Sequence, residues 1–251
     1  MKAEGIRDNL AKIRRRIESA AARAGRRPEE ITLIGVSKTH PGESIREAFA
    51  AGVRHFGENR VQEWEGKRAG VADLAAKWHL IGHLQSNKAA RAAREFHSVD
   101  SVDDFGLAQR LDRARAEKSA DREIGVPGTT MAEAGKLRVL IEVRMAPEES
   151  KSGVEKAAVA ELAGKIMGLT NLELAGLMCI PPLLEDAERV RPYFAGLREL
   201  KEQVAAEAGA RLPVLSMGMS HDFEVAIEEG ATEVRVGTAL FGSRARPATL
   251  G

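Results

Sequence analysis

The sequence predicts a (β/α)₈ barrel of the TIM type, an α/β fold, with one extra helix at its N-terminal end. Eight short runs rich in Val, Ile and Leu occur along the 251 residues, and each leads into a segment with helical periodicity. Continuous apolar strands of this kind are typical of parallel sheets that are covered on both faces. One such barrel usually has about 250 residues, so we expect residues 1–251 to form a single domain.

The first half of the chain is predicted to hold the extra helix and the first strand–helix units. The extra helix covers about residues 4–24, where one face carries Ile6, Leu10, Ile13 and Ile17. Ile31 to Lys38 forms the first strand, and a helix at about 44–51 follows it. The next strands and their helices are expected at 54–57 and 61–74, at 77–82 and 87–95, and at 96–100 and 102–117.

The second half begins with a predicted surface loop insertion at 118–136, because Gly125-Val-Pro-Gly-Thr-Thr130 is typical of turns. Strands are expected at 137–143, 172–178, 212–216 and 233–236. The helices between them are expected at about 154–167, around Phe194 to Val204 with Pro192 in the first turn, and at 220–229, capped by Ser220 and ended by Gly230. A doubly wound open sheet is the structural alternative, but no glycine-rich dinucleotide motif follows the first strand.

The composition excludes several classes of protein. The net charge is only +1 although 30% of the residues are charged, so no overall field favours nucleic acid or an anionic membrane as a partner. A single cysteine, Cys179, excludes an internal disulfide framework and suits a reducing compartment. No apolar stretch has the length of a membrane span, and the first residues do not resemble a secretory signal. We therefore expect a cytoplasmic protein.

Lys38 is the first candidate for chemistry, because it ends an apolar strand abruptly. Active groups of a barrel lie at the C-terminal ends of its strands. Partial removal of an amine from water favours its neutral form, which can attack a carbonyl compound and form a Schiff base. A strand-end lysine that reaches into solvent is the simpler interpretation of Lys38 taken alone.

Two later loops predict an anion site at the same end of the barrel. Ser216-Met-Gly-Met-Ser220 runs from the seventh strand into a predicted helix start, where backbone amides and the positive end of the helix dipole converge. In this loop Gly218 permits close backbone approach and Ser220 caps the helix. Gly237 and Thr238 follow the eighth strand and can offer further amides and a hydroxyl. Phosphate sites in barrels are commonly built from these last two loops, although each motif alone is ordinary turn chemistry.

A strand-end lysine that faces a phosphate site suits two classes of protein. One is a Schiff-base sugar-phosphate lyase, and the other is a protein that binds pyridoxal 5'-phosphate (PLP). Arg235 favours PLP, because strand alternation turns it toward the interior, from where it can reach the ring nitrogen.

Other polar residues receive structural interpretations. His79 and His83 straddle a strand end, so we expect two hydrogen-bonded histidines and no metal site. Cys179 is expected to be a small buried hydrophobe. Glu58 lies near a strand end and either serves as an acid or base or organises its loop.

The motifs Gly35-Val-Ser-Lys-Thr39, Phe56-Gly-Glu-Asn59, Leu215-Ser-Met-Gly-Met-Ser220 and Val234-Arg-Val-Gly-Thr238 together resemble those of the pyridoxal-phosphate homeostasis protein family. Members of this family are similar to the barrel domain of alanine racemase standing alone, and the match runs from about Ile31 to Arg244.

The resemblance implies a monomeric or weakly associating barrel that binds PLP. Lys38 would hold the cofactor as an internal aldimine, and Asn59 would lie beside its ring. Arg235 would face the pyridine nitrogen, and Lys151 matches a second lysine near the pocket. The phosphate would be held by Ser216, Gly218, Ser220, Gly237 and Thr238.

Two chemical arguments favour a carrier over an enzyme. Racemisation uses the cofactor ring as an electron sink, and a protonated ring nitrogen strengthens it, whereas Arg235 cannot accept a proton. Racemisation also needs a second base, which a tyrosine from an additional C-terminal domain supplies in racemases. The chain ends soon after the eighth strand, and its only tyrosine, Tyr193, is expected outside the barrel mouth.

We therefore expect a protein that binds PLP and buffers or delivers it, with apo forms of PLP-dependent enzymes as recipients. It would contribute to vitamin B6 and amino-acid balance without robust catalysis. A PLP-dependent amino-acid racemase of narrow range is the alternative.

Overall fold

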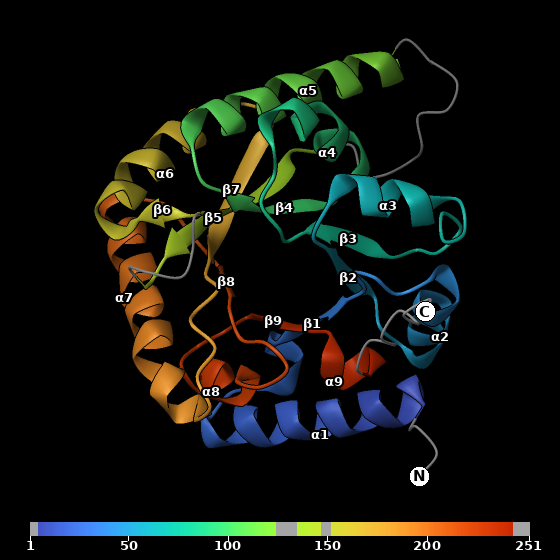
Figure 1. Ribbon diagram of the computed structural model, residues 1–251. Helices are drawn as coiled ribbons and strands as arrows, with labels where there is room; N and C mark the ends of the chain where they lie inside the picture. Colours follow the sequence, from blue (N-terminus) through green and yellow to red (C-terminus); the bar gives the residue numbers. More distant parts are fainter. Residues whose placement is uncertain (1–4, 124–134, 147–151, 243–251) are drawn as a thin grey trace, which may run out of the picture.

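Within residues 5–123, 135–146 and 152–242, which the computed structural model describes, eight parallel strands close into a barrel (Figure 1). Seven of its pairings follow the sheet order, and pairing of β4 with β5 closes the ring. The strands are β1 (Thr32–Val36), β2 (His55–Glu58), β3 (Lys77–Leu80), β4 (Ser98–Val102), β5 (Leu137–Arg144), β7 (Leu172–Met178), β8 (Val214–Ser216) and β9 (Glu233–Val236). The predicted (β/α)₈ fold is confirmed.

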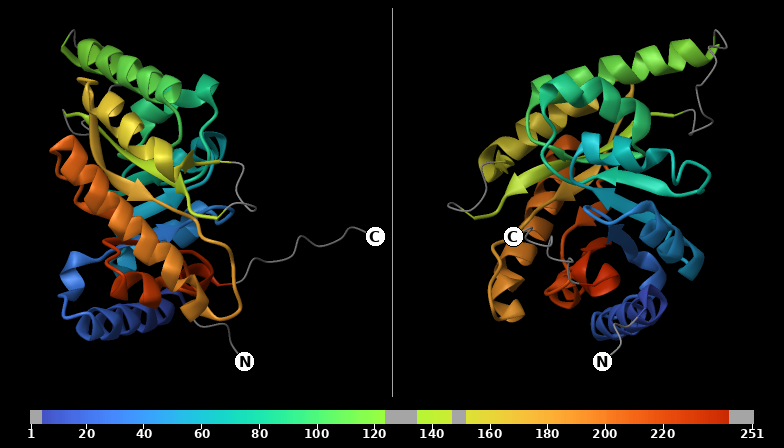
Figure 2. Two further views of the ribbon diagram at one scale, coloured as in Figure 1. Left: turned by 90° about the vertical axis from the view of Figure 1, so that its left-hand side faces the viewer. Right: turned by 45° about the vertical axis from the view of Figure 1, so that its right-hand side comes forward.

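Helices form a ring outside the strands (Figures 1 and 2). They are α1 (Ile6–Arg23), α2 (Gly42–Ala51), α3 (Val61–Arg68), α4 (Ala89–Glu95), α5 (Phe105–Glu123), α6 (Val159–Met167), α7 (Arg191–Ala208), α8 (Phe223–Glu228) and α9 (Thr238–Phe241). The extra N-terminal helix α1 buries the predicted isoleucine and leucine face and contacts α2, α8 and α9. No helix of the described part of the chain is long and apolar enough to cross a lipid bilayer.

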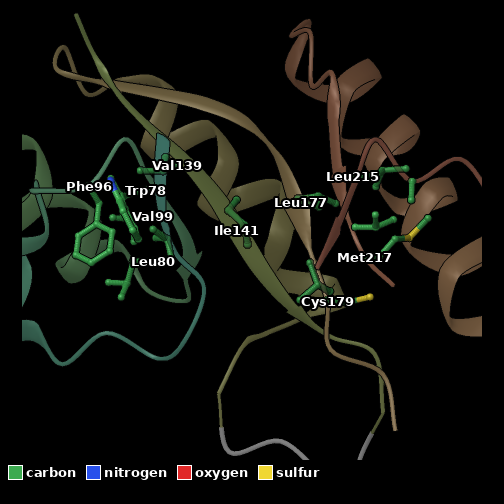
Figure 3. Close-up of a cluster of buried hydrophobic side chains, with 14 of the residues drawn as sticks. Trp78, Leu80, Phe96, Val99, Val139, Ile141, Leu177, Cys179, Leu215 and Met217 are labelled. Carbon is green, nitrogen blue, oxygen red and sulfur yellow. The ribbon is translucent and has the colours of Figure 1, made fainter. Parts of the chain in front are cut away.

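The two faces of the barrel wall differ in chemistry. A large hydrophobic cluster joins residues of the strands to residues of the helices, and Figure 3 labels its strand members Trp78, Leu80, Ile141, Leu177 and Leu215. A small apolar cluster, separate from the main core, consists of Leu140, Ala175, Met178 and Val214. Several strand residues with buried side chains are polar or charged, among them His79, Ser98, Asp100, Glu142, Glu233 and Arg235, whereas barrel interiors are usually filled by branched aliphatic side chains. Such charges are costly to bury unless they are paired, so the interior of this barrel is organised by hydrogen bonds.

The structure corrects the predicted loop insertion at 118–136. Helix α5 continues through 118–123, since this segment consists largely of good helix formers. Lys118 is buried, and its Nζ donates to the Arg94 carbonyl oxygen at 2.7 Å. Residues 124–134 of the expected loop lie outside the described residues.

Three predicted helices start or end elsewhere. Val154 and Glu155 form the short strand β6 (Val154–Glu155) beside β5, so α6 begins only at Val159. Helix α3 ends at Arg68 instead of continuing to about residue 74. Helix α8 begins at Phe223, not at Ser220.

Candidate functional site

Lys38 lies two residues beyond the end of β1, in a turn at the C-terminal mouth of the barrel. The His40 amide donates to the Ser37 carbonyl oxygen at 3.0 Å and closes this turn. Val36 faces the barrel interior, and strand alternation turns Lys38 to the same side. The residue is half-buried.

The end of β9 lies directly beside the end of β1. The parallel register pairs Ile34 with Arg235 and Gly35 with Val236, so the next residues, Gly237 and Thr238, come level with the Lys38 turn. A Cβ atom at Gly237 would lie 3.4 Å from the Cβ and the carbonyl oxygen of Val36. The absence of a side chain at Gly237 therefore leaves the two backbones in close contact.

Helix α9, which was not predicted from the sequence, begins at Thr238. The His40 ring stacks on Phe241 with 4.7 Å between ring centroids, which ties the Lys38 turn to α9. The amides of a first helical turn have no acceptor within their own helix. Short helices of this kind after the last strands are where phosphate groups bind in many barrels.

Ser220 belongs to the start of α9 instead of capping α8. Its Oγ accepts a hydrogen bond from the Ala239 amide at 3.3 Å. The α8 side is held by Asp222, whose Oδ1 accepts the Met219 amide at 2.6 Å. Two residues, His221 and Asp222, separate Ser220 from the first residue of α8, Phe223, so Ser220 is not at the capping position of that helix. Ser220 and Thr238, predicted to share one site, are brought together by this contact.

Gly218 has a conformation that only glycine adopts easily, with φ of +91°. A Cβ atom there would lie 2.6 Å from the Ala226 Cβ and 2.9 Å from the Phe223 Cα. The Gly218 carbonyl oxygen accepts the Arg235 amide at 2.9 Å, so the loop stays attached to β9. Close packing onto α8 thus fixes the course of the predicted phosphate loop.

Arg235 lies in the barrel wall below this loop and is 4% exposed. Its guanidinium donates to Ser216 Oγ at 2.9 Å and to the Cys179 carbonyl oxygen at 2.7 Å. Both contacts fix the direction of the Arg235 side chain. Strand alternation had predicted that this side chain faces the barrel interior. Ser216 is fully buried in β8, and its hydroxyl serves to orient Arg235, a use that the sequence did not suggest.

Asn59 follows β2 and borders a pocket of about 700 Å³. The other residues that line this pocket are Arg60, Val61, Gln62, Leu80, Gly82, His83, Leu84, Gln85 and Lys88. A Cβ atom at Gly82 would lie 2.4 Å from the Asn59 carbonyl oxygen, so Gly82 allows the ends of β2 and β3 to approach closely. Asn59 is thereby held at the mouth, one strand away from Lys38.

Comparisons with known proteins find relatives over nearly the whole chain. The model of the alanine racemase N-terminal domain family matches residues 9–245. The pyridoxal phosphate homeostasis protein of Aquifex aeolicus is 44% identical over 237 residues, covering 94% of this chain and 97% of that protein. The protein of the same name from Pseudomonas aeruginosa is 45% identical over 239 residues, covering 95% and 96%. The chain belongs to the pyridoxal phosphate homeostasis protein family.

Solved structures are also similar to this chain. PipY of Synechococcus elongatus PCC7942, solved with PLP bound, superposes with a TM-score of 0.79 at 39% identity, covering 94% of this chain and 100% of that one. Alanine racemase of Clostridium difficile 630 superposes with a TM-score of 0.70 at 15% identity, which shows a common fold. The present chain covers 57% of that racemase chain.

Glu142 is a residue of the mouth that the sequence reasoning missed. It lies on β5 and is 4% exposed. Its Oε1 accepts from Ser152 Oγ at 3.1 Å, while its Oε2 has no hydrogen-bond partner among the described residues. Burial raises the pKa of this carboxyl, and the hydrogen bond from Ser152 and the nearby positive Arg235 oppose the rise only in part. A lone carboxylate within the apolar run 137–143 was the signal that could have identified it.

Because the folded protein raises the pKa of Glu142, the fold favours its protonated form. The stability that this carboxyl contributes is therefore fully present below its unfolded pKa of about 4.3 and is lost as the pH rises through the folded pKa. We expect Glu142→Gln, which keeps the shape without ionising, to gain stability relative to the parent protein as the pH rises from about 4 to 8. Urea unfolding of both proteins without cofactor measures this, and parallel stability curves would contradict it.

A second polar cluster lies near the N-terminal strand ends, away from the mouth. His79 Nε2 lies 2.9 Å from His55 Nδ1, and His79 Nδ1 lies 3.2 Å from Asp100 Oδ2. Burial and His79 lower the pKa of His55 to about 3, so His55 is neutral. Potential metal-binding atoms of His79, Asp100 and Glu233 lie within 4.8 Å of one another. Arg138 forms a 2.6 Å ion pair with Glu233 and supplies positive charge there, so we assign the cluster a structural role.

The remaining residues singled out from the sequence lie as follows. His83 forms an ion-pair contact with Asp103 at 3.4 Å. Cys179 is fully buried, and burial raises its pKa to about 12, which leaves no reactive thiolate at neutral pH. Glu58 is buried between β2 and α3. Lys151 lies outside the described residues.

Proposed function

We propose that this protein binds PLP at the C-terminal mouth of its barrel, with Lys38 as the covalent attachment point. The Lys38 amine nitrogen would bond to the aldehyde carbon of the cofactor, forming a Schiff base and releasing one water molecule. The observation that carries the proposal is the register of β1 and β9. It brings the Lys38 turn, the start of α9 and the buried Arg235 to one side of one opening.

The residues present fit the parts of PLP. Hydroxyls of Ser220 and Thr238, with backbone amides at the start of α9 and in the Gly218 loop, suit the phosphate. Arg235 suits the unprotonated pyridine nitrogen, because a guanidinium can only donate hydrogen bonds. Asn59 lies on the β2 side of Lys38, where it can border the ring.

We infer that the protein holds and delivers PLP without robust turnover of its own. A donor at the ring nitrogen leaves the ring a weaker electron sink, which disfavours racemisation and transamination. Tyr193 lies in the first turn of α7 and packs against the core on the outer side of the barrel wall. The names of its relatives support the same role. We propose that it acts in the cytoplasm as a monomer, with apo forms of PLP-dependent enzymes as recipients.

One observation favours the alternative, an amino-acid racemase of narrow range. Glu142 carries a carboxyl oxygen without a hydrogen-bond partner among the described residues and has a raised pKa. Such a carboxyl can donate or accept a proton. Turnover measurements therefore have to accompany any binding measurement.

Titration of the purified protein with PLP tests the proposal. We expect an absorption band at the edge of the visible range and recovery of activity when an apo PLP-dependent enzyme is added. Incubation with single amino acids should give no turnover at ordinary enzyme rates of roughly 1 to 10³ per second. A protein that gains no band with PLP would contradict the binding role. Substrate-dependent racemisation at those rates would contradict the carrier role.

A further inference from the structure

The turn that carries Lys38 has an unfavourable backbone conformation. Lys38 and Thr39 are its two central residues, because the His40 amide bonds back to the Ser37 carbonyl oxygen at 3.0 Å. Thr39 has φ of +66°, and among the described residues no other non-glycine residue has a positive φ. A β-branched residue rarely adopts this left-handed conformation. Neighbouring groups must therefore hold the turn in place.

Helix α3 supplies those groups from outside the barrel wall. Glu63 Oε1 accepts a hydrogen bond from the Thr39 amide. Lys67, one helical turn later, donates from Nζ to the Ser37 carbonyl oxygen at 2.7 Å and to Glu63 Oε1 at 3.1 Å. The residues immediately before and after Lys38 are thus both bound to one helix.

Glu58 fixes the position of Lys67. Its carboxylate side chain is fully buried and accepts from Lys67 Nζ at 3.0 and 3.1 Å and from Ser37 Oγ at 2.7 Å. Lys67 itself is only 12% exposed, so this ion pair is shielded from water. Ser37 and Glu58 face α3, whereas alternation turns Lys38 into the mouth. The contacts therefore act on the backbone on both sides of Lys38.

We propose that Glu63 and Lys67 are positioning residues, which hold the strained Ser37–His40 turn and so direct the Lys38 amine toward the cofactor before it arrives. The inference rests on the proposed PLP site. A turn that is already in its binding conformation does not have to be ordered during binding. If the restraint is removed, the free turn relaxes, and PLP binding has to restore the strained form.

Glu63→Leu is the variant that tests this role. It removes the acceptor of the Thr39 amide and leaves the Glu58–Lys67 pair intact. Replacement of Lys67 would instead strand a buried carboxylate and endanger folding. We expect Glu63→Leu to weaken PLP binding by about tenfold or more and to slow growth of the absorption band, because it removes a charge-assisted hydrogen bond.

Two control variants isolate the positioning effect. Glu65→Leu makes the same change on the same helix and loses a 2.7 Å ion pair with Arg91, so we expect it to bind PLP like the parent protein. Glu63→Gln keeps an oxygen acceptor for the Thr39 amide and should retain most of the affinity. Circular dichroism establishes that each variant is folded.

A rescue variant separates restraint of the turn from a general structural effect. Glycine adopts positive φ without steric cost, and the Thr39 side chain is exposed. Thr39→Gly added to Glu63→Leu should therefore restore most of the lost affinity and rate. Parent-like binding by Glu63→Leu would overturn the positioning role alone, as would failure of Thr39→Gly to restore binding. Absence of PLP binding by the parent protein would overturn the proposed function as well.

Discussion

Replacement of Lys38 by alanine is expected to abolish the PLP absorption band. The amine is the only group of this residue that can bond to the cofactor aldehyde, and alanine leaves nothing at that place. Folding should be nearly unaffected, because Lys38 is half-buried in a turn outside β1, and such substitutions usually change the unfolding free energy by less than about 0.5 kcal/mol. Absorption titration, followed by borohydride reduction and mass measurement of the labelled peptide, provides the readout.

Lys77→Ala is the matched control for Lys38→Ala. Lys77 is exposed at the first residue of β3, at the opposite end of the barrel from the mouth. It should keep the band and the labelled Lys38 peptide. A band that persists in Lys38→Ala would assign the attachment to another lysine and refute the placement of the cofactor.

Gly218→Ala is expected to be the most damaging single-methyl change in the predicted phosphate loop. The left-handed backbone costs alanine about 1–2 kcal/mol. A methyl group forced to 2.6 Å from the Ala226 Cβ adds an overpacking cost of about 1–3 kcal/mol. The loop can relieve this clash only by moving away from α8 and β9, so PLP affinity should fall together with stability. Urea unfolding and PLP titration measure the two effects.

Gly230→Ala separates the backbone cost from the packing cost. Gly230 has φ of +97°, but the nearest atom to its Cβ would be the flexible Arg198 Cδ at 3.5 Å. We expect this variant to lose only about 1–2 kcal/mol of unfolding free energy and to keep its PLP affinity. Equal losses in the two variants would show that close packing of Gly218 on α8 is unimportant.

The positions of the strands could be predicted from local pattern. Buried parallel strands are continuous apolar runs, and this sequence has eight of them with helical segments between them. Lys38 stood out for the same reason, because it ends such a run with a charge. Ends of helices were less certain, since α5 continues into 118–123 and α8 begins three residues after Ser220. Local propensity does not show where tertiary contacts, and not a further helical turn, satisfy the backbone N–H and C=O groups at a helix end.

The sequence by itself determined the barrel, the lysine at its mouth and the glycine- and serine-rich loops, because each depends on residues adjacent in the chain. Only the tertiary structure decided which side chains meet. The contact of Ser220 with α9, the use of Ser216 to orient Arg235 and the unpartnered oxygen of Glu142 depend on strand register and on helix packing. The restraint of the Lys38 turn by Glu63 and Lys67 likewise joins segments that are far apart until α3 packs beside β1 and β2.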